Sequence, residues 1–352
     1  MLFSCSLPPV NSSAGQGTRA FGWGALTSVL FILAVGLWRP ASGDDSSVLL
    51  DRMARQGVVL TEDVQATLPP PTFLNDQGEL LQPAVAEEKL KTIAAPLGGV
   101  GRFLRDSIVA PISIRIQSID NAAGKRIGHQ LDFIFAVPEP IEKLRDSEQI
   151  RKMVGDAGAD EEATEPATSG ADSEAFDPTE DSRSRPLTEQ QIDRYGLQTD
   201  PSRRSIRTLQ FPLMDRVIIE GVVQTERSVW NEADPGSPVV FAWQLDPRFS
   251  PGADGSLVAG ATSDGLANIW RGIERGDRGQ KVVSEPSPYR GIGGYLAITP
   301  APGQPEVSIL QASLVLHEPQ DWFAGRNQIR SKLPLIVQDR VRRLRRQIRN
   351  AP

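Results

Sequence analysis

Cysteine and histidine are almost absent from this 352-residue chain. Cysteine occurs once, at Cys5, so no intramolecular disulfide can form and no thiolate metal cluster can be built. The two histidines, His129 and His317, are far apart in the sequence, and a zinc site would need both of them together with carboxylates. We therefore predict no metal site and no cofactor.

Long uncharged runs are also scarce, and the clearest one covers residues 21–38 (FGWGALTSVLFILAVGLW). Arg19 precedes it and the small residues Ala41-Ser42-Gly43 follow it, which is the pattern of a secretory signal with its cleavage site. We predict that residues 1–43 are a signal peptide and that the protein is exported to the periplasm or cell envelope. The alternative is an uncleaved N-terminal anchor, a single transmembrane helix, because the whole run is long enough to cross a bilayer.

Positive charge is missing from residues 156–182, which hold ten acidic side chains and neither lysine nor arginine. This acidic tract has too few apolar side chains to offset the entropy lost on ordering, so we predict a disordered insertion over residues 155–186. The net charge of the chain is -6, and removing the ten acids changes it to +4. The acidity of the protein therefore belongs to one tract.

Little periodicity is visible in residues 44–83, which contain the stiff sequence Pro69-Pro70-Pro71. We predict a linker there, with one short helix over Val48 to Arg55. A second helix is predicted after the linker, because its apolar residues lie on one side and a proline and two glycines follow them. The apolar residues are Ala86, Leu90 and Ile93, and the residues that end the helix are Pro96, Gly98 and Gly99.

Alternating apolar and polar residues predict antiparallel strands in several places. Residues 112–117 and 131–137 alternate on either side of a turn at Asp120–Gly124, which predicts a hairpin. Further strands are predicted over residues 217–226 and 239–245, and a last hairpin is predicted over residues 295–317.

Two further local signals complete the pattern. Thr188 with Gln191 three residues later predicts a capping box at the start of a short helix. Residues 247–292 are rich in glycine, serine, proline and charge, and we expect long loops there around a short element over Ala267 to Trp270. The order of elements predicts an α+β fold, mainly an antiparallel β-sheet packed against a long C-terminal amphipathic helix. Its domain would comprise residues 84–154 and 187–350, split by the disordered insertion.

Catalytic motifs are missing as well. The chain has no G-x-S-x-G segment and no phosphate-loop spacing. His129 begins a predicted strand, where a packed histidine is the usual case. His317 precedes Glu318 and is near Asp321, so a polar site is one interpretation and a simple strand exit is the other. We name no catalytic residue.

The predicted C-terminal helix carries both an apolar stripe and a cluster of arginines. Val337, Val341, Leu344 and Ile348 recur at spacings of four, three and four, which places them on one side, and Pro334 is positioned to start the helix. The other faces form a candidate electrostatic surface made of Arg340, Arg342, Arg343, Arg345, Arg346 and Arg349.

These arginines have four interpretations. They are solvated side chains near a helix C-terminus, they touch the acidic tract of the same chain, they bind an anionic membrane surface, or they bind nucleic acid. Export removes the usual nucleic acid, and the helix offers no interleaved aromatic residues for base stacking. We therefore expect no nucleic acid partner. Solvated arginines on a helix that packs its stripe on the sheet are the leading interpretation, and among the three partners we favour the acidic tract, with anionic lipid next.

The function that the sequence favours is that of an exported, non-enzymatic structural or interaction protein of the envelope. The alternative is a binding domain that holds an apolar or lipid-like ligand between the sheet and the C-terminal helix. A hydrolase that uses His129 or His317 is the least favoured reading. A pocket between sheet and helix would distinguish the binding domain from the others.

Overall fold

The computed structural model describes residues 48–145, 147, 150, 183–199, 203–214, 216–251, 266–276, 280–320, 322–325 and 328–350. The predicted signal peptide or anchor lies outside the described residues, and so does the acidic tract. Across these described ranges, no helix is both long and apolar enough to span a bilayer.

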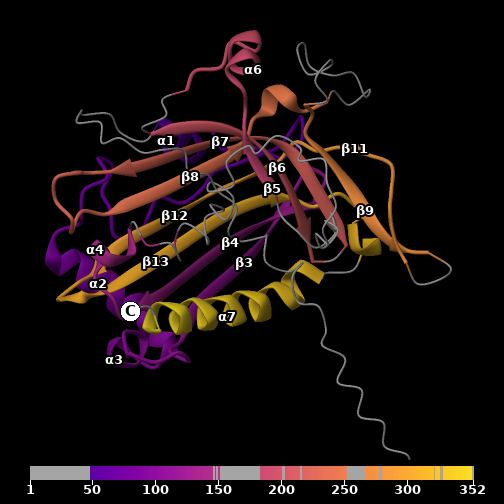
Figure 1. The fold of residues 1–352 in the computed structure, drawn as a ribbon. Helices are drawn as coiled ribbons and strands as arrows, with labels where there is room; N and C mark the ends of the chain where they lie inside the picture. Colours follow the sequence, from indigo (N-terminus) through magenta and orange to yellow (C-terminus); the bar gives the residue numbers. More distant parts are fainter. Residues whose placement is uncertain are drawn as a thin grey trace, which may run out of the picture.

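The described helices are arranged around one large sheet (Figure 1). The α-helices are α1 (Val48–Arg55), α2 (Pro83–Ala94), α3 (Val100–Phe103), α4 (Ile141–Leu144), α6 (Glu189–Arg194) and α7 (Gln328–Arg349). Short 3-10 turns are η2 (Ala95–Leu97), η3 (Pro247–Phe249) and η4 (Trp322–Gly325), and a separate small ladder pairs β1 (Val58–Val59) with β2 (Gln65–Ala66).

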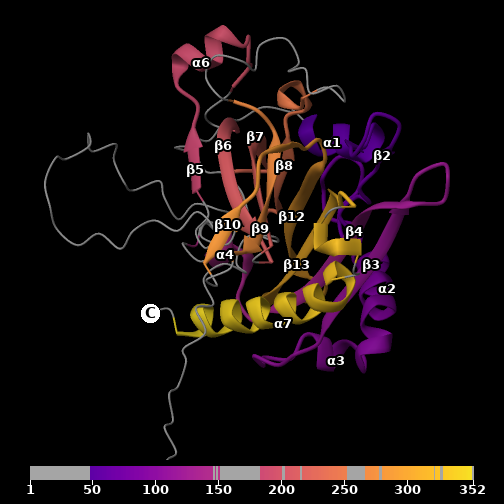
Figure 2. The ribbon, with the colours of Figure 1, turned by 90° about the vertical axis from the view of Figure 1, so that its right-hand side faces the viewer.

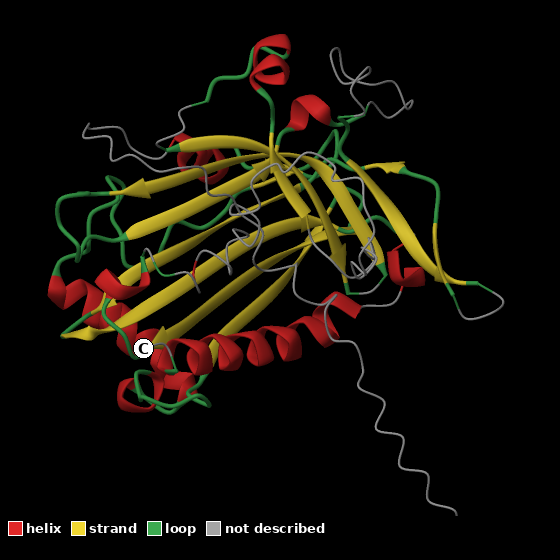
Figure 3. Cartoon of the chain, in the orientation of Figure 1, coloured by secondary structure: helices red, strands yellow, loops and turns green. Residues whose placement is uncertain are grey.

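The large sheet has eleven antiparallel strands and confirms the predicted α+β class (Figure 3). Its main path is β10-β9-β7-β8-β12-β13-β4-β3, while β6 and then β5 extend from β7, and β11 pairs with β9. The strands are β3 (Ile112–Asp120), β4 (Arg126–Val137), β5 (Arg183–Pro186), β6 (Arg204–Leu213), β7 (Val217–Val229), β8 (Val239–Leu245), β9 (Ile269–Arg275), β10 (Lys281–Val283), β11 (Ser287–Pro288), β12 (Ile292–Ala301) and β13 (Gln304–His317).

The local signals for hairpins and caps are confirmed. β3 and β4 pair across a turn in which Gly124 has φ +73°, and β12 pairs with β13 across a turn at Gly303, with φ +74°. Glycine adopts this left-handed backbone without steric strain. Thr188 and Gln191 make the predicted capping box at the start of α6, and Gly98 ends η2 with φ +95°.

The two faces of the sheet are covered by different parts of the chain. Successive side chains of a strand point to opposite faces. Leu314 and Leu316 of β13 belong to the cluster that packs against α7, whereas Val315 belongs to the cluster beneath α1. We call these sides the α7 face and the α1 face (Figure 2).

The short helix predicted over Val48 to Arg55 is confirmed as α1. The linker predicted for the rest of residues 44–83 is wrong for its described part, because residues 56–83 also pack on the α1 face. Met53 and Leu60 are fully buried, and Leu68 and Phe73 are 2% exposed. Each of these apolar side chains makes its own separate contact with the sheet. A segment held by such isolated contacts needs no periodic pattern of its own, which is why its packing was not visible in the sequence.

Other predictions also need correction. Residues 183–186, placed in the disordered insertion, form edge strand β5, and the long loops expected over residues 247–292 contain β9, β10 and β11. β6 was not predicted at all, although Leu209, Phe211 and Leu213 alternate along it. Pro334 does not start the last helix but lies inside α7, which begins at Gln328.

Candidate functional site

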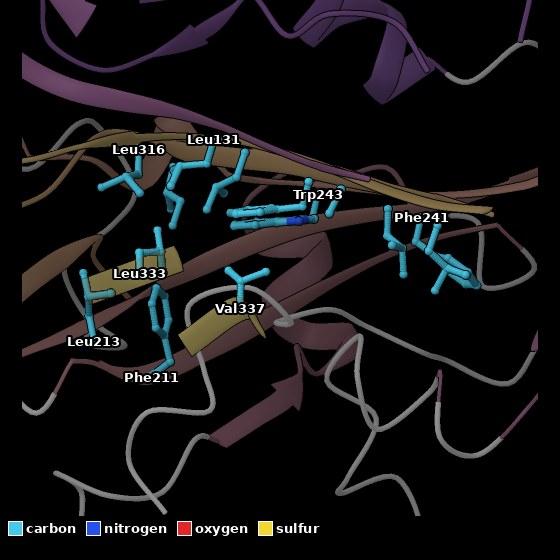
Figure 4. Packing of buried hydrophobic residues seen from close by; sticks show 14 of the residues in the cluster. Leu131, Phe211, Leu213, Phe241, Trp243, Leu316, Leu333 and Val337 are labelled. Atoms are coloured by element: carbon cyan, nitrogen blue, oxygen red, sulfur yellow. The ribbon is translucent and has the colours of Figure 1, made fainter. Parts of the chain in front are cut away.

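The apolar stripe of α7 lies directly on the sheet, as predicted. Ile329 and Leu333 extend the four predicted residues, and all six side chains are less than a tenth exposed. Figure 4 shows Leu333 and Val337 pointing toward sheet residues such as Trp243 and Leu316. The cluster contains 34 buried residues, of which 21 come from six strands and six come from α7.

One end of α7 is fixed by Arg345, which is 3% exposed. Its Nε donates to the carbonyl of Ala136 at 3.0 Å and its Nη1 to that of Ala110 at 2.7 Å. Burial lowers the pKa of Arg345 to about 10, with a further contribution from Arg342. Arg345 therefore anchors the helix inside the protein. It was predicted to be part of an electrostatic surface, but its side chain is not at the surface.

The remaining arginines of the predicted surface are distributed unevenly. Arg342 and Arg346 are exposed, while Arg343 pairs with Asp339 at 2.9 Å. Arg349 is exposed and pairs with Asp106 at 2.7 Å. Partial burial, chiefly, lowers the pKa of Arg340 to about 10.

At the other end of the apolar cluster the structure brings both histidines into one polar cluster. His129 lies on β4 opposite Leu316 and is fully buried. Its Nε2 is 2.6 Å from Oε2 of Glu318, and Nε of Arg126 is 3.4 Å from the same oxygen. The polar cluster comprises Arg126, His129, Tyr289, His317, Glu318 and Trp322; Asp321 lies outside the described residues.

Tyr289 joins the two halves of this polar cluster. Its ring stacks on His317 at a centroid distance of 5.9 Å and on Trp322 at 5.5 Å, and its hydroxyl donates to the carbonyl of His317 at 3.0 Å. Trp270 meets Trp322 edge-on at 5.9 Å. The cluster is therefore continuous with the aromatic part of the layer beneath α7.

Burial favours the neutral forms of two groups in the polar cluster, His317 and Tyr289. It lowers the pKa of His317 to about 4, although Glu318 acts in the opposite direction. It raises the pKa of Tyr289 well above its ordinary value, and Glu318 adds to that increase. At neutral pH, the imidazole of His317 and the phenol of Tyr289 are both uncharged.

Three buried polar atoms in this cluster have no hydrogen-bond partner within the described part of the chain. They are Nδ1 of His129, Nδ1 of His317 and Nε1 of Trp322. The side chains of His129 and Trp322 are 0% and 1% exposed. A buried polar atom left without a partner costs about 1–3 kcal/mol.

The polar cluster lacks the arrangement of a metal or nucleophile site. Among the described residues, no group of three or more histidine, cysteine, aspartate or glutamate side chains could hold a metal ion. The hydrogen bond of His129 goes to the carboxylate of Glu318. Nucleophilic catalysis instead requires a base bonded to a hydroxyl or thiol.

A second polar network holds α1 on the opposite face. Glu226 is 3% exposed, and its carboxylate accepts a hydrogen bond from the backbone N–H of Leu49 at 2.8 Å. It also pairs with Arg203 at 3.1 Å and Arg204 at 3.5 Å. Arg52 of α1 donates to Gln224 at 2.8 Å. These bonds attach α1 to the sheet.

A surface pocket of about 460 Å³ lies on the N-terminal segment, away from both networks. It is open to solvent and has both polar and apolar walls. Its lining consists of Pro70, Pro71, Thr72, Leu74, Asn75, Asp76, Gln77, Leu81 and Lys89. No residue of α7 lines it, so it is not the pocket expected between the sheet and the C-terminal helix. It is also separate from the two histidines, so we do not place the site there.

Sequence reasoning identified His129, His317 and Glu318 as candidates but missed Tyr289, Trp322 and Arg126. Tyr289 is in the stretch predicted to be loops, and 28 residues separate it from the carbonyl that it binds. No local pattern marks such a contact, because the pairing of distant strands creates it.

Comparison with known proteins leaves the family open. No family model and no curated protein matches the chain. Among solved structures, a fragment of the STAR-related lipid transfer protein from Xanthomonas axonopodis is similar, with 11% identity and a TM-score of 0.32. The match covers 67% of this chain and 93% of that one. A TM-score this low does not establish a shared fold.

Proposed function

We propose that this protein is a non-enzymatic binding protein that holds an apolar ligand between the α7 face and α7. The observation that carries the proposal is that the sheet presents many more buried apolar side chains on the α7 face than α7 does. Six strands present 21 buried apolar side chains, and α7 contributes one stripe of six. Seven further residues, from α4, η4 and loops, cover other parts of this face. A helix is about 10 Å wide, whereas six strands span about 25 Å, so one helix covers only part of this face.

The way α7 is attached also supports the proposal. Arg345 fixes its C-terminal half through backbone carbonyls, while its middle is held to the sheet by apolar contacts. Apolar contacts are non-directional, so an apolar chain can replace them at little cost once the middle of the helix is displaced. Side chains such as Trp243 and Val337 would then contact the ligand instead of contacting each other.

An enzymatic function has weaker support. A hydrolase would need a nucleophile beside a histidine, and His129 is instead paired with a carboxylate. The low pKa of His317, about 4, leaves it a weak base. Export to the envelope remains a proposal that is supported by the signal-like residues 21–43.

Quenching of tryptophan fluorescence by bromohexadecane, delivered from cyclodextrin to the full chain, tests the binding proposal. Bromine quenches an indole at contact, and Trp243 and Trp322 are both buried in the layer. We expect saturable quenching that Val337→Phe weakens at least about tenfold, because the larger ring overfills the layer.

Leu335→Phe is the matched control, since Leu335 is on the same helix but is 66% exposed. It should quench like the unaltered protein. Absence of saturable quenching, or an equal effect of both substitutions, would contradict the proposal.

A further inference from the structure

The two most exposed large apolar side chains of the described residues lie on α7 and on the loop that is bonded to it. Leu335 of α7 is 66% exposed, and Val109, between α3 and β3, is 62% exposed. The next most exposed, Trp230, is at 48%. Single exposed apolar residues are ordinary, so the surroundings of this pair decide whether they mark a contact surface.

Leu335 shares the outer side of α7 with three arginines. Arg342, Arg346 and Arg349 follow it by seven, eleven and fourteen residues, which is close to two, three and four turns at about 3.6 residues per turn. All three arginines are exposed. They therefore lie with Leu335 on the side of the helix opposite the stripe that packs on the sheet.

The loop between α3 and β3 borders this outer side at the C-terminal end of α7. Asp106 pairs with Arg349 at 2.7 Å, and Nη1 of Arg345 is 3.4 Å from the carbonyl of Ile108. Val109 is the next residue of the loop. We call the following set the outer patch: Leu335, Arg342, Arg346 and Arg349 of α7, with the exposed loop residues Arg105, Asp106 and Val109.

The outer patch is strongly positive. Its four arginines and one aspartate give a net charge of +3, and the neighbouring pair of Arg343 with Asp339 adds none. Within the part of the chain that the structure describes, neither Arg342 nor Arg346 forms an ion pair with a carboxylate. Their charges are therefore available to a partner outside the fold.

Positive charge beside exposed apolar side chains fits an anionic bilayer better than the other candidate partners. Lipid headgroups attract arginines, and the interface beneath them accepts apolar side chains. The acidic tract at residues 156–182 offers charge, but Phe176 is its only large apolar residue. Nucleic acid offers phosphates, but the outer patch has no aromatic side chain to stack on bases.

We infer that the outer patch docks the protein on an anionic lipid surface. Val109 and Leu335 enter the interface, and the arginines of the patch contact the lipid headgroups. This inference goes beyond the proposed function, because it concerns the opposite side of α7 and stands whether or not an apolar ligand binds beneath the helix.

Local fluorescent probes on the full chain test this contact. Val109→Cys and Leu335→Cys, each in a Cys5→Ser background, are labelled with an environment-sensitive nitrobenzoxadiazole dye. We expect emission at both positions to rise and shift to the blue on vesicles of phosphatidylcholine with phosphatidylserine, and to stay unchanged on phosphatidylcholine alone. Val282→Cys is the matched control, since Val282 is an exposed valine on β10, at the opposite end of the sheet from β3. Its emission should not change.

The probes report the outer patch itself, which matters because the apolar run over residues 21–38 can attach the full chain to vesicles on its own. No change at Val109 and Leu335, or an equal change at Val282, would overturn the inference. The same response on phosphatidylcholine alone would overturn it too. A response to DNA or to a peptide of residues 156–182, without one to vesicles, would assign the surface to that partner instead.

Arg342→Gln combined with Arg346→Gln tests the electrostatic part, with the probe at Val109 as the readout. Each arginine near an anionic surface contributes about fivefold to affinity, so we expect a loss of at least about tenfold at low salt. Arg185→Gln combined with Arg275→Gln removes the same charge from exposed positions on β5 and β9, and it should change the affinity by less than about twofold. Equal losses in the two double variants would show that net charge alone attracts the protein, which contradicts a defined outer patch.

Discussion

The two faces of the sheet each bury one carboxylate, but they treat it differently. On the α1 face, Glu226 accepts from a backbone N–H and pairs with Arg203 and Arg204. On the α7 face, Glu318 pairs with His129 and Arg126, and neighbouring buried polar atoms have no partner within the described residues.

This difference indicates different roles for the two networks. Hydrogen bonds that end on α1 stabilise the position of α1, and their loss leaves a charge buried without its partner. Buried side-chain atoms without a hydrogen bond occur in both networks, Nε of Arg204 among them, so the contrast rests on what each network holds. None of the hydrogen bonds described above for the polar cluster ends on α7. Under the proposed function, the α1 face is the structural side and the α7 face is the side that binds the ligand.

The largest expected effect comes from breaking the structural side. Glu226→Ala removes the acceptor of Leu49 and leaves two arginines beside it without that carboxylate. We expect the free energy of unfolding to fall by about 3–4 kcal/mol, measured by urea denaturation.

Glu220→Ala is the matched control on the same strand. Its side chain is 29% exposed and pairs with a partly exposed Arg271, so a loss below about 1 kcal/mol is expected. Equal losses in the two variants would remove the distinction between the networks.

A pH titration probes the α7 face through His317. Its pKa is about 4 in the folded protein against 6.5 for the free side chain, so the unfolded state binds more protons between these values. The free energy of unfolding should be unaffected by this group above pH 6.5. It should decrease by about 3 kcal/mol in total as the pH falls from 6.5 to 4.

His317→Gln removes this titration and should flatten that part of the stability profile. Denaturant midpoints measured at several pH values between 4 and 7 provide the comparison. An unchanged slope in His317→Gln would show that other groups cause the acid sensitivity.

A smaller effect is expected where α7 is anchored. Arg345→Met introduces an apolar side chain of similar length and removes the bonds to the carbonyls of Ala136 and Ala110. We expect a loss of about 2 kcal/mol in urea denaturation. Arg342→Met, on the exposed side of the same helix, should change stability by less than about 0.5 kcal/mol.

The smallest effect concerns the outer arginines of α7. If the acidic tract masks Arg342 and Arg346, deleting residues 156–182 should increase binding to anionic vesicles at low salt. The increase should vanish near physiological salt, because exposed charges are screened. Unchanged vesicle binding after the deletion would count against masking.

Local signals predicted those elements whose residues contact near neighbours in the sequence. The hairpin over residues 112–137 and the stripe from Val337 to Ile348 were readable because period two and period 3.6 mark one apolar side. The linker was misjudged because its buried residues beyond α1, such as Leu60 and Phe73, follow no period. β9 was predicted only as a short element over Ala267 to Trp270, because its residues do not alternate between buried and exposed and one of its partners, β7, begins about 50 residues earlier.

The sequence by itself determined that an antiparallel sheet would pack on an amphipathic C-terminal helix, since hydrophobic periodicity fixes which side of each element is buried. The strands were predicted to be half-exposed, which is wrong for the central strands, because the N-terminal segment covers the second face. Only the tertiary structure decided which polar groups meet inside that layer. His129 and Glu318 are 189 residues apart, and their contact depends on the register of β4 against β13. Register between strands is set by the packing of whole faces, which no short stretch of sequence contains.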